Sequence, residues 1–576
     1  MRIAAIRREA GPMILALVFG LTAGLARGEE PADALLKLVP ADAGATLVVE
    51  DLRGHARAIL DSKLVADLVQ LPAVRAWLDA EGRAQLAKAG RDIELAFKAS
   101  FTRLRDDLLG DAVVLCLRLD PGAPAADVRG LLLLRARDRA LLDATIAAIN
   151  ESEQKSGQLQ GVDRRDAGGQ PYWVRRSKQS DAYAILPGDI FAWSNSEAII
   201  VGLLERRADA AGLAGDPRVD EIRRELPKHG LASLFVDPRF VERIADQAAD
   251  AETQANDPGA QLVSRVLAAV RYAAATLEFD EGLKLHVRET LDAGKLDPWI
   301  KTWVAREGDV EALVKRVPAG ALAMAAMHVD LASLLRGIAP FQPAEDVWMH
   351  RNFLVAARGL LLGRDPMGAV LPRLGPNVLA FLGAPGEGAS ARPPVVLTMS
   401  MDNRDGVGEA VDNALRTLLA LVSLDKDRRE ARWTIEDRTI DGVKATSVAG
   451  SPGPFTYAVG EALIALGTSP DAVAAVISLG DRPGLTSRLA EIRAKYSPKS
   501  QTFACVDLEA LVRLAGTQRA ALLAMLSSGE GDASPADFDQ LLAIANLFRC
   551  ASLACEVDPE FRLASQAIAL IGRSAP

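Results

Sequence analysis

The sequence predicts an α+β fold made of two tandem homologous units, each a mostly antiparallel sheet with helices packed on one face. Three observations lead to this prediction: two sequence matches recur at one offset, short strand patterns lie at hairpin spacing, and helical patterns come in groups. A doubly wound parallel sheet would instead require regular alternation of strands and helices. We expect residues 29–300 to form the first unit and residues 301–576 the second, with the boundary in a helical stretch near residues 296–310.

The two matches lie at the beginning and at the end of each predicted unit. DALLKLVPA begins at Asp33 and EALVKRVPA begins at Glu311, and both precede an apolar run that ends in aspartate. RYAAATLEFD begins at Arg271 and RCASLACEVD begins at Arg549. Both matches are ungapped and share one offset although they lie far apart in the chain. This agreement indicates a duplication.

The middle of each unit repeats one order of elements. We expect a strand, several helices, a strand pair, a helix, a strand meander, two helices, a strand, two helices and a closing hairpin. Short glycine-containing turns, followed by NSEA or SPDA at a helix start, support the end of each meander. The strand pair and helix are expected at residues 108–120, 131–135 and 140–153 in the first unit, and at 374–382, 395–400 and 405–422 in the second.

The N-terminus has the layout of a cleavable signal peptide, predicted over residues 1–28. Arg2, Arg7 and Arg8 precede the apolar run PMILALVFGLTAGLA, and Ala26 and Gly28 provide small residues at a cleavage site. This run is short for a bilayer span, although an uncleaved signal anchor is the alternative. We therefore expect a secreted or periplasmic protein without a membrane span in the mature chain.

The composition is that of a globular protein with a mild acidic excess. Hydrophobic residues make up 49% and charged residues 25% of the chain, with a net charge of −9. Removal of residues 1–28 takes away four arginines and one glutamate, so the exported chain is more acidic still. No run of Lys and Arg could follow a phosphate backbone, which argues against nucleic acid as a partner.

One small motif, an apolar strand that ends in aspartate before a helical pattern, occurs four times. The aspartates are Asp51, Asp237, Asp330 and Asp507. An aspartate between strand and helix accepts hydrogen bonds from the free N–H groups of the first helical turn, and Pro238 suits the first helical position. A carboxylate placed for acid–base chemistry or for a cation is the weaker alternative.

The four cysteines are predicted to fill the core. In the aligned repeats, Cys116, Cys505, Cys550 and Cys555 each stand opposite a large and mainly apolar residue of the other unit. A buried cysteine behaves as a small hydrophobe. The alternative in an exported protein is a disulfide, for which Cys505 with Cys550 or Cys555 is the pair expected to lie close together.

We predict no catalytic, cofactor-binding or metal-ligating residue. The five histidines stand alone in their segments, no CxxC or GxSxG occurs, and the glycine-rich stretch near Gly386 lacks the strand and helix of a dinucleotide site. One recurrent charged pair is of interest: Arg271 with Glu278, and Arg549 with Glu556. We expect it to be an ion pair that fixes the corner between helix and strand.

The export signal, the opening LLKLVPADAGATLVVED and the following LRGHARAILDSKLVADL resemble a family of large exported bacterial proteins that are known only as domains of unknown function. The resemblance is strongest over about the first 80 residues and again from Pro318. It implies export and an α+β repeat, and it implies no activity, cofactor or catalytic residue.

These observations favour a soluble, non-enzymatic exported protein: a binding, scaffold or envelope-associated module whose partner would be a protein or an envelope component. Two alternatives remain. A hydrolase with a site assembled from distant residues predicts a cleft of convergent polar groups. A carrier of an apolar ligand or lipid predicts an exposed or cavity-lining apolar patch on the sheet.

Overall fold

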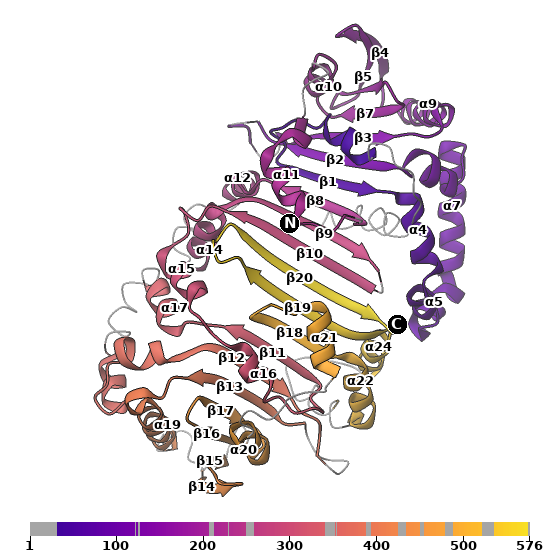
Figure 1. Ribbon diagram of the computed structural model, residues 1–576. Helices are drawn as coiled ribbons and strands as arrows, with labels where there is room; N and C mark the ends of the chain where they lie inside the picture. Colours follow the sequence, from indigo (N-terminus) through magenta and orange to yellow (C-terminus); the bar gives the residue numbers. More distant parts are fainter. Residues whose placement is uncertain are drawn as a thin grey trace. The chain divides into compact units, whose positions relative to one another are not determined.

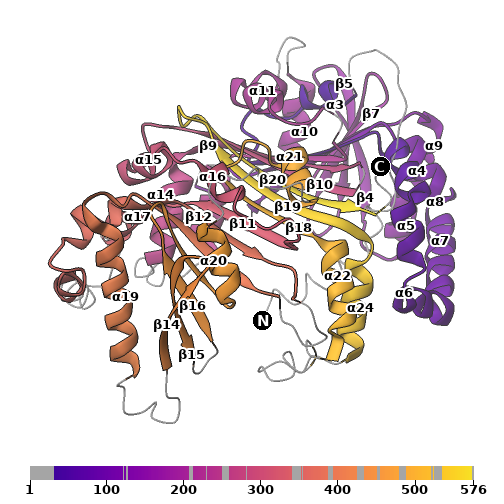
Figure 2. The ribbon, with the colours of Figure 1, turned by 60° about the horizontal axis from the view of Figure 1, so that its bottom comes forward.

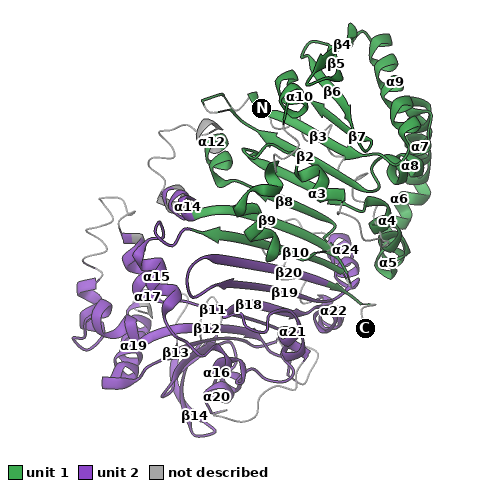
Figure 3. Ribbon diagram, turned by 45° about the horizontal axis from the view of Figure 1, so that its top comes forward, with its two compact units in different colours: residues 1–254, 270–291, 571–576 green, residues 255–269, 292–570 purple. Residues whose placement is uncertain are grey.

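The computed structural model divides the chain into two compact units (Figure 3). Unit 1 comprises residues 1–254, 270–291 and 571–576, and unit 2 comprises residues 255–269 and 292–570. The predicted boundary residues 296–310 belong to unit 2. Residues 1–28, the predicted signal peptide, lie outside the described residues. The structure describes residues 31–120, 122–124, 127–206, 212–228, 230–248, 258–280, 282–339, 352, 354–386, 393–423, 434–449, 454–478, 488–520, 523 and 535–573.

The described strands of unit 1 form a ten-stranded antiparallel sheet. Figure 1 shows its strands β3, β2, β1, β8 and β9 side by side. From the outer strand β4, the spatial order is β4 (Gly161–Ala167), β5 (Gln170–Arg176), β6 (Asp181–Leu186), β7 (Ile190–Ser194), β3 (Arg129–Arg135), β2 (Ala112–Arg118), β1 (Ala45–Glu50), β8 (Ala232–Val236), β9 (Val270–Phe279) and β10 (Gly282–Leu291).

The helices of unit 1 follow the predicted order, with a group between β1 and β2 (Figure 2). Their bounds are α3 (Pro31–Leu36), α4 (Leu52–Asp61), α5 (Lys63–Val69), α6 (Pro72–Trp77), η1 (Leu78–Gly82), α7 (Arg83–Phe97), α8 (Phe101–Arg103), η2 (Leu104–Leu108), α9 (Arg139–Lys155), α10 (Glu197–Leu204), η4 (Gly212–Gly215), α11 (Pro217–Arg224) and α12 (Pro238–Ala248). The strand pair and helix predicted from residue 108 onward are confirmed as β2, β3 and α9.

Unit 2 also contains ten described strands in one antiparallel sheet, and its outer strand is β14. The order is β14 (Thr434–Ile440), β15 (Val443–Ala449), β16 (Phe455–Val459), β17 (Leu463–Gly467), β13 (Val395–Met401), β12 (Leu374–Leu382), β11 (Ala323–His328), β18 (Thr502–Asp507), β19 (Phe548–Val557) and β20 (Leu563–Gly572). Each strand of unit 2 therefore occupies the place that the strand numbered ten lower occupies in unit 1.

The helices of unit 2 lie between its strands in an order similar to that of unit 1, except α14, which belongs to this unit although it lies between β8 and β9 in the chain. They are α14 (Pro258–Ala269), α15 (Pro298–Ala305), α16 (Val310–Val314), α17 (Leu331–Ile338), η6 (Pro366–Val370), η7 (Leu371–Arg373), η8 (Arg404–Gly406), α19 (Val407–Ser423), α20 (Pro470–Ser478), α21 (Arg488–Tyr496), α22 (Leu508–Thr517) and α24 (Pro535–Ala545). The predicted strands at residues 374–382 and 395–400 and the helix at 405–422 are confirmed as β12, β13 and α19.

Helices pack on both faces of each sheet, so the prediction of one covered face is wrong. In unit 1, Val114 and Leu133 belong to a core with α3, α10 and α11, while their neighbours Val113 and Leu134 pack on the opposite face with η2 and α9. In unit 2, α19 packs beside Met401 on the second face. Successive side chains of a strand point to opposite faces, so strands that are apolar at adjacent positions can be covered on both.

The outer strands β4 and β14 carry charge. β4 contains Asp163, Arg164, Arg165 and Asp166, and β14 contains Glu436, Asp437 and Arg438. An outer strand exposes unpaired N–H and C=O groups, and charged side chains disfavour pairing with another chain there. The composition of both strands therefore suits the ends of the two sheets.

Candidate binding pocket

The four aspartates that follow strands serve as caps. The side chains of Asp51, Asp330 and Asp507 accept hydrogen bonds from the first turns of α4, α17 and α22, over 3.1, 3.1 and 2.9 Å. Asp237 accepts from the N–H of Arg239 over 3.0 Å in the first turn of α12, where Pro238 is the first residue. The predicted capping role is confirmed for all four.

The predicted ion pair between Arg271 and Glu278 is wrong. Arg271 lies 3.8 Å from Glu221, whereas Glu278 lies 2.9 Å from Nε2 of His286 on the neighbouring strand. In unit 2, Glu556 accepts a hydrogen bond from Ser500 over 2.6 Å. Alternation along β9 explains the difference, because residues seven apart on a strand lie on opposite faces.

The cysteines and the described histidines are held in the fold. All four thiols are free, and Cys116, Cys505 and Cys550 are buried. Burial raises the pKa of Cys116 to about 12 and that of Cys505 to about 11, because a thiolate is poorly solvated there. His328 contacts the backbone carbonyl of Trp303 over 3.1 Å.

Metal ligands do not gather in the part of the chain that the structure describes. There, no group of three or more His, Cys, Asp and Glu side chains could hold a metal ion. His229 and His350 lie outside the described residues.

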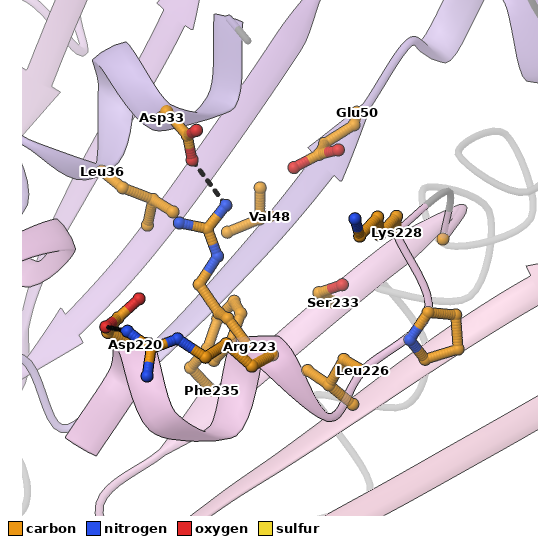
Figure 4. Close-up of a pocket in the computed structure, with 13 residues that line it drawn as sticks. Asp33, Leu36, Val48, Glu50, Asp220, Arg223, Leu226, Lys228, Ser233 and Phe235 are labelled. Carbon is orange, nitrogen blue, oxygen red and sulfur yellow. Dashed lines mark hydrogen bonds and ion pairs between the residues drawn. The ribbon is translucent and has the colours of Figure 1, made fainter. Parts of the chain in front are cut away.

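A recess of about 460 Å³ in unit 1 is the candidate binding pocket (Figure 4). It lies over strands β1 and β8, between α3 and α11. Its apolar lining consists of Leu36, Val48, Leu226 and Phe235, which are buried, together with Pro227. Its polar lining consists of Asp33, Glu50, Asp220, Arg223, Arg224, Lys228 and Ser233, and Gly230 completes it. A volume of this size falls in the range of small-molecule sites.

Local sequence places α11 beside the recess. Asp216 accepts a hydrogen bond from the N–H of Arg218 over 2.8 Å, and Pro217 takes the first helical position. Val219 and Ile222 are buried, so this face of α11 packs on the sheet. Arg223, the next residue, lies on the side of the helix that is next to α3. Beyond the helix, a Cβ at Gly230 would lie 2.2 Å from Thr276, and only glycine fits there without movement of its neighbour.

Both arginines of the recess form ion pairs, whereas its lysine does not. Arg223 donates to Asp33 over 2.5 Å, and Arg224 donates to Asp220 one helical turn earlier. Glu50 has an interaction of its own. Within the described parts of the chain, Lys228 takes part in no hydrogen bond or ion pair, and it is exposed. The recess therefore holds one cationic group whose charge is not compensated.

Unit 2 contains a recess of about 400 Å³ at the corresponding place. It lies between α16 and α21 and is lined by Glu311, Val314, Lys315, Ala490, Arg493, Ala494 and Pro498. Arg493 pairs with Glu311 as Arg223 pairs with Asp33. The guanidinium of Arg493 lies over the Phe503 ring, 4.4 Å from its centroid. The register of β18 places Phe503 where unit 1 has Ser233, so a ring occupies the space that the small serine leaves open.

The sequence alignment pairs Asp33 with Glu311 but does not reveal the recess. The sequence feature that could have indicated it is the pair Arg223 and Arg493, which stand at matching positions before Asp237 and Asp507. An acid and an arginine that recur together in two units indicate a shared contact.

A third recess, of about 350 Å³, lies beside α19 in unit 2. Arg416 in it donates to Asp412 over 2.9 Å, to Asp437 over 3.0 Å and to Thr446 over 2.9 Å. The hydroxyl of Tyr457 donates to Asp412 over 3.1 Å, and burial raises the pKa of this tyrosine to about 12. These groups satisfy one another, and the network ties α19 to β14, β15 and β16.

An apolar row crosses the second face of each sheet. In unit 1 the paired residues, strand by strand, are Tyr183, Trp193, Leu132, Leu115, Leu47, Leu234, Ala275 and Val287. In unit 2 they are Tyr457, Leu466, Leu397, Ala380, Ala325, Ala504 and Leu553. Leu115, Leu234, Leu397, Leu466 and Leu553 are exposed, by 36 to 42%. Each row is therefore covered only in part.

No family model, curated protein or solved structure matches the chain. Among the described residues, no helix combines the length and the apolar character that crossing a bilayer requires.

Proposed function

We propose that this chain is an exported, non-enzymatic binding module and that the recess beside α11 is its ligand site. The observation that carries the proposal is the unpaired Lys228 at the rim of a recess with an apolar floor. Among the described residues, the four aspartates cap helices and Arg416 joins α19 to a hairpin, so these side chains serve the fold. A binding role requires only such a concave site with a few polar groups.

We further propose that the two units arose by duplication. Three features support this origin: the common strand order, the two ungapped sequence matches, and two ion pairs that recur. Asp33 with Arg223 corresponds to Glu311 with Arg493. Asp237 with Arg218, at 3.0 Å, corresponds to Asp507 with Arg488, at 3.9 Å. Divergence at Ser233 and Phe503 would then have left the open site in unit 1.

Export to the periplasm or the medium remains part of the proposal, supported by the layout of residues 1–28 and by the resemblance to exported proteins. A module of this kind would meet its partner, a small molecule, a protein or an envelope component, outside the cytoplasm.

The test is mass spectrometry of small molecules that stay bound to the purified protein. We expect a compound to be released on denaturation of the natural protein and to be absent from Ser233→Phe, which places in unit 1 the residue that unit 2 has. The matched control is Phe503→Ser, which leaves the unit 1 recess as it is. Release of the same compound from the folded Ser233→Phe protein would refute the site.

A second candidate, a carrier of a hydrocarbon chain, is favoured by the partly exposed apolar rows. Exposed apolar area of this kind on a sheet suits an acyl chain that lies across the strands. The probe is dansyl-labelled undecanoic acid, whose fluorescence rises in apolar surroundings. We expect Leu115→Gln with Leu234→Gln to abolish the rise, and Leu86→Gln, on the exposed side of α7, to leave it unchanged. An unchanged signal from the double variant would eliminate this candidate.

A further inference from the structure

We infer that the recess of unit 1 binds a small organic anion with an apolar body, whose anionic group lies between Lys228 and Arg223. This inference rests on the proposed binding function and specifies its ligand class. Figure 4 shows the guanidinium of Arg223 directed toward Asp33. Val48 and Ser233 lie between Arg223 and Lys228 in this view. The two cationic groups thus border the same space from α11 and from the loop that follows it.

The charges of the recess select an anion over a cation. Asp33 and Asp220 are already neutralised by Arg223 and Arg224, and Glu50 is engaged as well. A ligand ammonium group that binds Asp33 or Asp220 would have to displace an arginine. A carboxylate would instead meet the uncompensated Lys228 and the guanidinium of Arg223, which has five N–H donors and gives one of them to Asp33.

The floor of the recess selects an apolar body. Leu36, Val48, Leu226 and Phe235 form it, and contact with them removes apolar surface of the ligand from water. Ser233 is the polar exception, and its hydroxyl already lies 3.0 Å from the hydroxyl of Thr276. An inorganic anion would leave this floor unused, so we expect the chain of the ligand to add affinity.

Unit 2 provides the contrast. Arg493 is held between Glu311 and the Phe503 ring and is only 8% exposed, whereas Arg223 is 30% exposed. The guanidinium of Arg493 is therefore less accessible to a ligand, and the Phe503 ring fills the space that is open over Ser233 in unit 1. The anion site is thus assigned to unit 1 alone, although both recesses share an acid–arginine pair.

The experiment measures binding of hexanoate to the full chain by ligand-observed NMR, with hexylamine as the probe of equal chain and opposite charge. We expect hexanoate to bind and hexylamine not to bind. Lys228→Gln should weaken hexanoate binding about fivefold, as the loss of one exposed charge contact predicts. Ser233→Phe should abolish it, and Lys315→Gln, at the unit 2 recess, should leave it unchanged.

Three results would overturn the inference: equal binding of both probes, an unchanged hexanoate affinity in Lys228→Gln, or an effect of Lys315→Gln equal to that of Lys228→Gln. Lys228 is exposed, so its replacement does not threaten folding. Failure of the inference is distinguishable from failure of the binding function. A co-purifying compound that Ser233→Phe removes while Lys228→Gln retains it would uphold the site and refute the anion.

Discussion

The aspartates that cap helices form different numbers of hydrogen bonds and ion pairs, so they contribute different amounts to the stability of the fold. Asp51 accepts one hydrogen bond at the start of α4. Asp330 is buried, accepts from the N–H of Ala332 and from the hydroxyl of Ser333, and pairs with Arg306 at 3.0 Å. We expect Asp51→Ala to lower the free energy of unfolding by about 1 kcal/mol. Asp330→Ala should lower it by about 3 kcal/mol, because Arg306 loses its buried partner. Urea unfolding checks both, and equal losses would contradict the argument.

Asp330 also predicts a dependence of stability on pH. Burial pushes its pKa upward, but the hydrogen bonds from Ser333, the charge of Arg306 and the Ala332 N–H outweigh this effect and leave the pKa below the ordinary value. The stabilisation is therefore present above the pKa of an unfolded aspartate, about 4, and is lost as the pH falls through the folded value. We expect the difference in unfolding free energy between the natural protein and Asp330→Asn to shrink between pH 5 and pH 3. A difference that stays constant would exclude this linkage.

The cysteines predict a defined order of thiol reactivity. Burial raises the pKa of all four thiols and suppresses the reactive thiolate. We expect Ellman's reagent at pH 8 to modify Cys555, which is only half-buried, before the buried Cys116 and Cys505, and to modify all four after unfolding. A disulfide of Cys505 with Cys550 or Cys555 would remove two thiols from the unfolded count.

At the scale of elements, the acid–arginine pairs join α3 to α11 and α16 to α21. Arg493 is more deeply buried than Arg223, at 8% against 30% exposure, while the acids Glu311 and Asp33 are both accessible. Removal of the acid leaves the arginine without its partner, and this costs more where the arginine is buried. We expect Glu311→Ala to lower the melting temperature more than Asp33→Ala does. The reverse order, measured by calorimetry, would show that burial of the arginine does not govern the contact.

The sequence predicted elements well where local patterns specify them. Alternation and turn residues located β2, β3, β12 and β13, and the strand–Asp motif located the starts of α4, α12, α17 and α22. The sequence predicted less well which faces of the sheets are covered by helices. Val113 and Val114 are both apolar, and their adjacency is equally compatible with a strand covered on both faces and with one at a partly exposed surface. Only the packing of η2 and α9 decides between them.

At the scale of the whole molecule, the candidate site could not be predicted because it depends on tertiary contacts. Asp33 and Arg223 are about 190 residues apart in the sequence, and the sheet brings their helices together. Ser233 is an ordinary strand residue until its position is compared with that of Phe503. The small side chain of Ser233 leaves open a part of the recess that the Phe503 ring occupies in unit 2, and one small residue in a strand forms no motif.

Each unit has buried apolar residues of its own, and this predicts that core substitutions act locally. Leu133 in β3 and Leu379 in β12 are buried, at 0 and 1% exposure. Leu→Ala at such a site costs about 2 to 5 kcal/mol through lost contacts and the cavity that remains. We expect Leu379→Ala to speed amide hydrogen exchange in β11, β12 and β13 and to leave β1, β2 and β3 protected, and Leu133→Ala to do the opposite. Mass spectrometry of the exchanged peptides checks the pair. If either variant deprotected both sets of strands equally, the two sheets would be one cooperative structure, and a substitution in the unit 2 core would then also loosen the recess beside α11.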